Sequence, residues 1–291
     1  MIVAIGIGLA FIAMLCWGFG DFLIQKSTRK MGDWETLFII TAFGVVVLLP
    51  FVWGRLPNLI NLSNIDLLII ALACIVLLIA ALFDFEALKK GKLSVIEPIW
   101  SLEVPVAALL AFLLMSERIS FEQVIFIITL LSCLILVGLK DRNINARFFL
   151  ERGVFVAILG AIFMGGANFL MGWGGRISDP LMINFLSDLF IMIITGIYLL
   201  SRGSFKGLLK DLKNNYGVLL PMSILDKVAW VAFVFAMSLA PIAVATALSE
   251  SYIIIAVLLG LLINKEKLHS HQKIGLIGAI IAAIFLTISS T

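Results

Sequence analysis

Long apolar segments alternate with short polar ones along the whole chain. A segment such as LLIIALACIVLLIAALF (67–83) is continuously apolar and lacks the apolar–polar alternation of a membrane β-strand. About 20 mainly apolar residues suffice to cross a bilayer as an α-helix. The pattern therefore predicts an all-α integral membrane protein. Its ten predicted transmembrane helices are 2–24, 36–53, 66–87, 94–115, 121–139, 153–174, 181–200, 217–238, 242–263 and 272–289.

Composition supports this interpretation. Hydrophobic residues make up 62% of the 291 positions and charged residues 13%, against about a quarter charged in a soluble domain. The net charge of +3 comes from residues in the loops, so it does not indicate nucleic-acid binding.

The basic residues fall on alternate loops. Of the 21 Lys and Arg, all but four lie between helices one and two, three and four, and so on. Cytoplasmic loops are enriched in Lys and Arg, so we expect both termini of this cell-membrane protein on the non-cytoplasmic side. The exceptions are Arg55, Arg118 and Arg176 on the opposite side, and Lys227 inside the segment 217–238.

Cysteine and histidine show no metal or disulfide pattern. Cys16, Cys74 and Cys133 each lie singly in a predicted span. His269 and His271 fall in a short loop, where a solvated pair is favoured over a metal site. We therefore expect no metal and no cofactor.

The chain contains an internal repeat. A shift of 149 residues aligns AALFDFEALKKGKLSVIE (80–97) with AWVAFVFAMSLAPIAVAT (229–246) without a gap, and a shift of 147 aligns WGFGDFL (17–23) with MGGANFL (164–170). Each copy would hold five helices, an odd number, so the second copy would begin on the opposite side of the membrane. Such inverted repeats place a substrate site near the midplane, between the copies. The predicted parts are a first repeat (1–140), a basic connecting loop (141–152) and a second repeat (153–291).

With these features the chain resembles the EamA-type transporters of the drug/metabolite transporter (DMT) superfamily, over nearly its whole length. The resemblance is carried by WGFG (17–20), the segment 240–268, IGLIGAIIAAIFL (274–286), and the glutamates Glu117 and Glu266. It implies a ten-helix carrier of small organic solutes, with a central cavity lined mainly by helices 1, 3, 4, 6, 8 and 9. These motifs identify a superfamily and no substrate.

The chain departs from the family pattern in two ways. Family members commonly have cytoplasmic termini, whereas the loop charges here indicate the reverse. The proline common after the acidic residue of the ninth helix is missing, because Ser251 and Tyr252 follow Glu250. We therefore expect this helix to be straighter than usual.

Several carboxyl groups lie inside predicted spans. A charge at mid-helix costs about 2.5–3.5 kcal/mol on insertion scales, so such groups usually face a cavity or a partner. Asp226 and Lys227 are adjacent and would point about 100° apart on a helix. We therefore expect Lys227 to act as counter-ion to another acid, with Glu250 as one candidate. Glu86 should pair with Lys89 and Lys90, its helical neighbours.

The segment LSVIEPIWSLEVP (93–105) combines acids with prolines. Pro98 and Pro105 remove helical hydrogen bonds, which predicts a bent or broken helix. Freed carbonyls at membrane depth are tolerated where protein or a water-filled cavity satisfies them. Proline kinks also serve packing alone, and we favour the cavity for Glu103 and Trp100.

The segment 217–238 carries a second polar surface. Asp226, Trp230 and Phe233 share one helical stripe, which resembles a binding wall. Asn168 is the repeat mate of Asp21. The predicted substrate-binding residues are Trp17, Asp84, Trp100, Glu103, Asn168, Asp226, Trp230, Glu250 and Tyr252, and the proton-coupling candidates are Glu97, Glu103 and Glu250.

These observations favour a secondary carrier that moves a small amino-acid-, amine- or drug-like metabolite by alternating access, with proton or cation coupling. The alternatives are an intramembrane enzyme and a non-transporting membrane sensor or channel. The chain lacks GxxxxGK[ST], so no nucleotide site for energy coupling is visible. It also lacks HExxH and GxSxG, and its carboxylates are scattered over several helices, so we expect no enzyme. Small-residue ridges, Ala157–Ala161–Gly165 and Gly275–Ala279–Ala283, suit either internal packing or a homodimer face.

Overall fold

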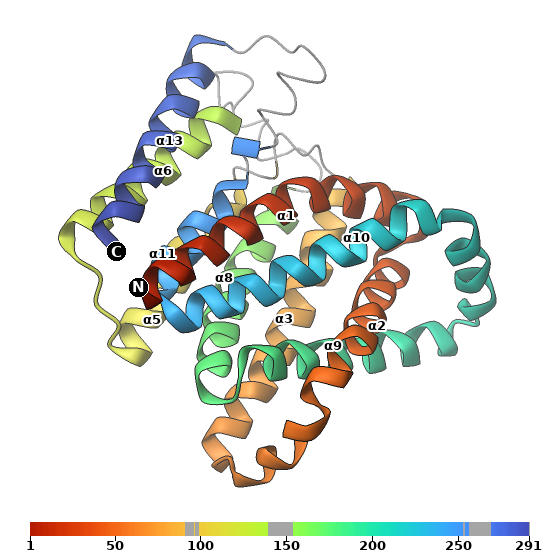
Figure 1. The fold of residues 1–291 in the computed structure, drawn as a ribbon. Coiled ribbons are helices and arrows are strands. Elements are labelled where there is room, and N and C mark those ends of the chain that lie inside the picture. Colours follow the sequence, from red (N-terminus) through yellow and green to blue (C-terminus); the bar gives the residue numbers. More distant parts are fainter. Residues whose placement is uncertain (91–95, 97–98, 139–153, 253, 256–268, 291) are drawn as a thin grey trace.

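The computed structural model describes residues 1–90, 96, 99–138, 154–252, 254–255 and 269–290, and every regular element in this part of the chain is helical (Figure 1). The elements are α1 (Ile2–Met31), α2 (Asp33–Val52), the 3₁₀-helix η1 (Trp53–Asn61), α3 (Asn64–Lys90), α5 (Glu103–Met115), α6 (Phe121–Gly138), α8 (Val154–Ile177), α9 (Pro180–Ser201), α10 (Phe205–Leu239), α11 (Ile242–Ser249), the 3₁₀-helix η2 (Glu250–Tyr252) and α13 (Ser270–Ser290).

Seven helical segments of the described chain are long and apolar enough to cross a membrane, and α5 and α6 are shorter apolar helices. The prediction of an all-helical, multi-pass membrane protein is therefore confirmed. The exact number of ten spans stays a prediction, in part because the predicted helix 242–263 extends beyond the described residues.

The predictions for the helices that carry Glu103 and Glu250 have different outcomes. The predicted break near Pro105 is confirmed, because the chain forms a turn at Ser101 and Leu102 and α5 begins at Glu103. The prediction of a straighter helix around Glu250 is wrong. There α11 ends at Ser249 and the chain tightens into η2, so this helix is interrupted without a proline.

Helices from the two halves of the chain pack against each other in pairs. The main pairs are α1 with α10, α3 with α8, α2 with α9, and α6 with α13, and Figure 1 shows α1 beside α10 and α6 beside α13. Replacing each helix by its repeat mate leaves this set unchanged: the first two pairs exchange, and each of the other two maps onto itself. The packing therefore follows the internal repeat.

The repeat mates α2 and α9 run in opposite directions. Gly44 of α2 lies against the carboxylate of Asp188 in α9. Nearer the start of α2, Phe38 lies against Gly196, nearer the end of α9. The mates α6 and α13 are antiparallel in the same way, since hydrogen bonds join the start of each to the end of the other.

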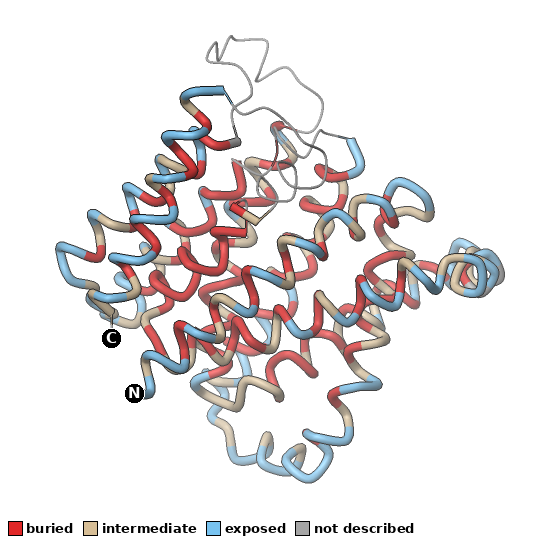
Figure 2. The backbone as a smooth tube through the Cα atoms, turned by 45° about the horizontal axis from the view of Figure 1, so that its top comes forward, coloured by how far each residue is buried: buried red, intermediate tan, exposed pale blue. Residues whose placement is uncertain are grey.

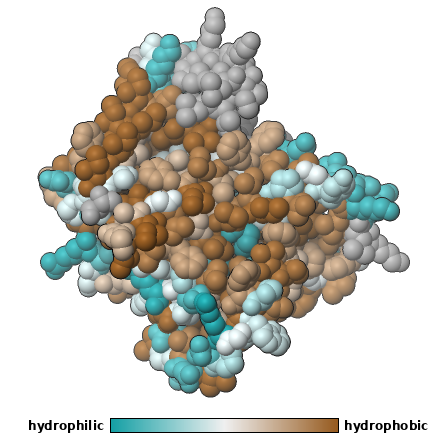
Figure 3. Space-filling model, in the orientation of Figure 1, coloured by the Kyte–Doolittle hydropathy of each residue, from teal (hydrophilic) through white to brown (hydrophobic). Residues whose placement is uncertain are grey.

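Buried positions gather where the paired helices meet, and Figure 2 shows them along the inner sides of the helices. The outer surface carries many exposed Ile, Leu and Phe side chains, and on the face drawn in Figure 3 hydrophobic side chains dominate while hydrophilic ones gather at the margins. This distribution suits contact with lipid. The small-residue ridges pack within the chain, with Gly165 against the backbone of Glu103 and Gly275 against that of Cys133.

Candidate functional site

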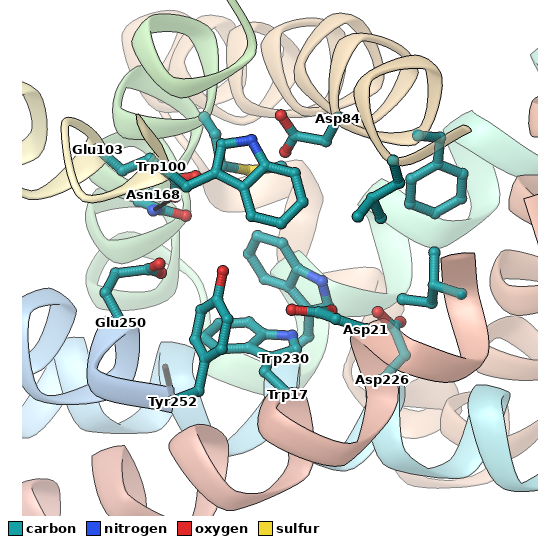
Figure 4. A pocket seen from close by; sticks show the side chains of 14 residues that line it. Trp17, Asp21, Asp84, Trp100, Glu103, Asn168, Asp226, Trp230, Glu250 and Tyr252 are labelled. Carbon is teal, nitrogen blue, oxygen red and sulfur yellow. Dashed lines mark hydrogen bonds between the residues drawn. The ribbon is translucent and has the colours of Figure 1, made fainter. Parts of the chain in front are cut away.

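A cavity lies between the two halves of the chain (Figure 4). Its described walls come from α1, α3, the Trp100–Glu103 segment, α8, α10 and η2. All of the predicted substrate-binding residues line it, namely Trp17, Asp84, Trp100, Glu103, Asn168, Asp226, Trp230, Glu250 and Tyr252, together with Asp21, Ile24, Phe85, Leu88 and Met164. We call this space the central cavity.

Interrupted helices bring two of the acids to the cavity. Glu103 is the first residue of α5, directly after the turn that follows Trp100, and Glu250 begins η2, directly after α11. Both side chains are buried. Proline at position 105 explains the first interruption, since it cannot donate a hydrogen bond to the carbonyl of Ser101.

The charged side chains that line the described wall of the central cavity are all acidic. Five carboxyl side chains line it, and the described lining residues include no Lys, Arg or His. Figure 4 shows these carboxyl groups reaching the cavity from different helices. The contributors are Asp21, Asp84, Glu103, Asp226 and Glu250. This arrangement favours a positively charged ligand in the central cavity.

Some buried polar atoms around the cavity lack hydrogen-bond partners within the described part of the chain: Asp84 Oδ1, Trp100 Nε1 and Ser101 Oγ. By contrast, Asn168 Nδ2 donates to Glu103 Oε2 over 3.0 Å. An unpaired buried polar group costs about 1–3 kcal/mol. Unpaired groups beside a cavity are suited to binding a polar ligand.

Aromatic rings form one wall. Trp17 of α1 and Trp230 of α10 meet edge to face, with ring centroids 5.5 Å apart. Phe233 packs behind both, 5.1 Å from the Trp17 ring, and is fully buried. The predicted stripe on α10 is thus divided: Asp226 and Trp230 line the cavity, whereas Phe233 supports them.

The central cavity is narrow in this conformation. About 80 Å³ of it admits water-sized molecules, which is room for roughly two or three waters at about 30 Å³ each. Ligand pockets for drug-sized molecules commonly measure about 300–1,000 Å³. A metabolite of ordinary size therefore requires the helices to move apart.

A second cavity adjoins the central one and shares four wall residues with it: Phe85, Met164, Asp226 and Trp230. It holds the ion pair of Lys227 and Asp188, with Lys227 Nζ 2.5 Å from Asp188 Oδ2. Lys227 was expected to face an acid other than Asp226, with Glu250 as one candidate. In the structure its ion-pair partner is Asp188, whereas Glu250 lines the central cavity.

Two further acids were singled out from the sequence. Glu97, a proton-coupling candidate, lies outside the described residues. Glu86 forms ion pairs with Lys89, at 3.7 Å, and with Lys90, as expected of a helix-surface acid. No cluster of three or more His, Cys, Asp or Glu suited to a metal occurs in the described chain.

The set of predicted binding residues omitted Asp21, although it lines the central cavity. The available indication was its alignment with Asn168 under the repeat shift. Asp21 lies close to the basic residues at the end of the first helix, and acids near loops usually pair with such residues. A surface ion pair was therefore the simpler expectation for it.

Comparison with known proteins gives a family. The model of the EamA-like transporter family matches twice, over residues 4–139 and 151–288. No curated protein matches. A solved structure described only as "Crystal structure of protein" is 14% identical and superimposes with a TM-score of 0.76, covering 98% of this chain and 97% of that one. At this identity the likeness concerns the fold alone.

Proposed function

Because the chain belongs to the EamA-like transporter family, we propose that it carries small organic cations, amines first among them, through the central cavity. The carrying observation is the lining of five carboxyl groups without a basic residue in the described wall. A cation placed there meets opposite charge in a low-dielectric setting, where electrostatic attraction is strong.

The aromatic wall favours the same class of substrate. A cation over a tryptophan face gains about 0.5–2 kcal/mol, and Trp17, Trp100 and Trp230 all border the cavity. Asp84 Oδ1 has no hydrogen-bond partner among the described residues, so it can accept a hydrogen bond from an ammonium group. Sugar phosphates and other anions would need several cationic side chains instead, so they are disfavoured.

Transport by alternating access fits the packing. The antiparallel repeat mates α2 and α9 support two inverted five-helix halves, ten helices in all, with the cavity between them. Rocking of one half against the other would open the cavity to each side in turn. The narrow cavity then corresponds to a conformation between the two open ones.

Proton coupling follows from the same charges. Five carboxylates cannot all stay ionised in a small cavity without cations, so the empty cavity would hold protons that an ammonium substrate displaces. Glu103 and Glu250, the acids that begin interrupted helices, are the described candidates for this exchange.

Reconstituted vesicles test the function. Purified protein in proteoliposomes is offered radiolabelled amines, amino acids and sugar phosphates, with and without a proton gradient. We expect amines added outside to be taken up when the vesicle interior is more acidic than the outside. Glu103→Gln should abolish uptake, whereas Glu122→Gln, the same change on the exposed surface of α6, should leave it intact. Preferred uptake of sugar phosphates would refute the proposal.

The loop charges support the additional proposal that both termini lie outside the cytoplasm. A tag on the N-terminus of the protein in intact cells should be cleaved by externally added protease. Its protection, with cleavage only after cell lysis, would reverse the orientation without affecting the proposed substrate class.

A further inference from the structure

The ion pair in the second cavity is almost completely buried. The side chains of Lys227 and Asp188 are 6% and 7% exposed, and each lies well inside a long apolar helix, α10 and α9. A buried pair of this kind often gives less stability than apolar residues of similar volume would. A stabilising role alone therefore does not account for it.

The neighbouring helix leaves room for this pair. A Cβ atom at Gly44 of α2 would collide with the carboxylate of Asp188 and with Cε of Lys227. Polar groups also line the cavity, since Thr41, Asn184 and Ser187 border it. The second cavity is thus a polar chamber within the apolar interior.

This chamber holds one ammonium group for two carboxyl groups. Asp226 borders both cavities, whereas Asp188 and Lys227 border only the second. Lys227 follows Asp226 directly on α10, so rotation of its long, flexible side chain changes which acid it accompanies. The charge state of Asp226, and with it the attraction of the central cavity for a cation, depends on where Lys227 lies.

We propose that Lys227 is a tethered cation that moves between Asp188 and Asp226, and that Asp188 binds one of the protons exchanged in the transport cycle. This inference rests on the proposed amine transport. With an ammonium substrate at Asp226, Lys227 pairs with Asp188, as in the structure. When the substrate leaves, Lys227 pairs with Asp226 and the Asp188 carboxylate binds a proton from water. One proton is bound for each substrate cation released, so charge is conserved.

The positions of the first repeat that align with Asp226 and Lys227 carry no charge. The shift of 149 residues aligns Asp226 and Lys227 with Leu77 and Leu78. A molecule therefore has one switch, which predicts one proton exchanged in each cycle at this site.

Few other titratable groups face Asp188. From α2 the chamber receives Thr41 and from α8 Met171, neither of which titrates, and α10 contributes Asp226 and Lys227. From α3, the buried thiol of Cys74 lies near Asp188 and Ser187. A Cys74→Ser variant therefore serves as a control for thiol titration.

Infrared spectroscopy tests proton binding without any substrate. Purified protein in lipid vesicles is titrated from acidic to alkaline pH while the carboxylic acid C=O band is recorded. We expect a band that is present at neutral pH and lost at alkaline pH in the wild type and in Cys74→Ser, and that Asp188→Asn removes. Lys227→Met should keep that band to a higher pH than the wild type, because no neighbouring ammonium group then favours the ionised carboxylate, and Lys227→Arg should titrate as the wild type does. An unchanged band in Asp188→Asn, or wild-type titration in Lys227→Met, would overturn the proposal.

Proton counting tests the exchange itself. Benzylammonium chloride is added to the protein in weak buffer containing a pH indicator, and bound amine is measured in parallel. We expect Asp188→Asn to release one proton fewer per amine bound than the wild type and Lys227→Arg do. Amine binding with equal release in Asp188→Asn would refute the switch. Absence of amine binding, with the infrared result intact, would instead refute the proposed substrate and leave Asp188 as a proton site.

Discussion

Arg176, at the end of α8, holds three separate chain segments together. Its Nε donates to Met237 O and its Nη2 to Ala240 O, each over 2.9 Å, while Nη1 lies 2.7 Å from Glu117 Oε2. Glu117 Oε1 in turn accepts the backbone N–H of Ile242 at the start of α11. One guanidinium group thus fixes the end of α8 to the α5–α6 connection and to the α10–α11 junction.

Arg176→Met would remove all three interactions. Hydrogen bonds to a charged group contribute about 1.5–3 kcal/mol each, and the arginine and glutamate side chains are only 27% and 13% exposed. Since partial exposure weakens such contacts, we expect a total loss of about 3 kcal/mol, within the range measured for broken buried pairs. At about 2–4 °C per kcal/mol, the melting temperature should fall by about 6–12 °C.

The assay is thermal unfolding of detergent-solubilised protein, followed by tryptophan fluorescence at one fixed heating rate. The matched control is Arg118→Met, which removes an exposed arginine that forms no ion pair within the described residues, one position after Glu117. A fall of less than about 2 °C for Arg176→Met, or an equal fall for both variants, would refute the reasoning.

Three further predictions concern the central cavity and the helix surface. Gly160→Val places a side chain against the Asp84 carboxylate and should lower amine uptake in proteoliposomes while the protein stays monodisperse on size-exclusion chromatography. Trp230→Leu should raise the Kd for benzylammonium about 2- to 30-fold, the equivalent of 0.5–2 kcal/mol of lost cation–π attraction, by calorimetry. Glu86→Gln removes ion pairs with Lys89 and Lys90 at the helix surface, where all three side chains are partly exposed. It should therefore change the free energy of unfolding by less than about 1 kcal/mol in the melting assay.

The lining of the central cavity could be predicted because charge is expensive inside a bilayer. Glu103 and Glu250 in otherwise apolar segments had to face a cavity or a partner, and Pro105 marked the helix break beside one of them. The repeat then indicated that the acids of the two halves approach each other. Sequence and repeat together selected nine of the lining residues and missed Asp21, which the same repeat aligns with Asn168.

Contacts between helices were beyond the sequence. The pairing of Lys227 with Asp188 depends on the packing of α9 against α10, and no spacing along the chain encodes it. The interruption at Glu250 occurs without a proline, and the Ser251 hydroxyl donates to the carbonyl oxygen of Ala247 over 2.8 Å, a contact that often bends helices. Hydropathy also missed the beginning of α10, because Phe205–Tyr216 is helical but too polar to count as part of a span.

That missed segment makes α10 much longer than a membrane crossing. Its 35 residues extend over about 52 Å, against about 30 Å of hydrocarbon. Lys30 Nζ, near the end of α1, donates to Asn215 Oδ1 over 2.6 Å, which ties the protruding part to its neighbour. Pro221 lies between this exposed end of α10 and the part that carries Lys227, at a position where helices commonly bend. A spin label or fluorophore attached to the exposed end would therefore measure how far movements near the midplane pass through that position, at a place in water and far from the substrate path.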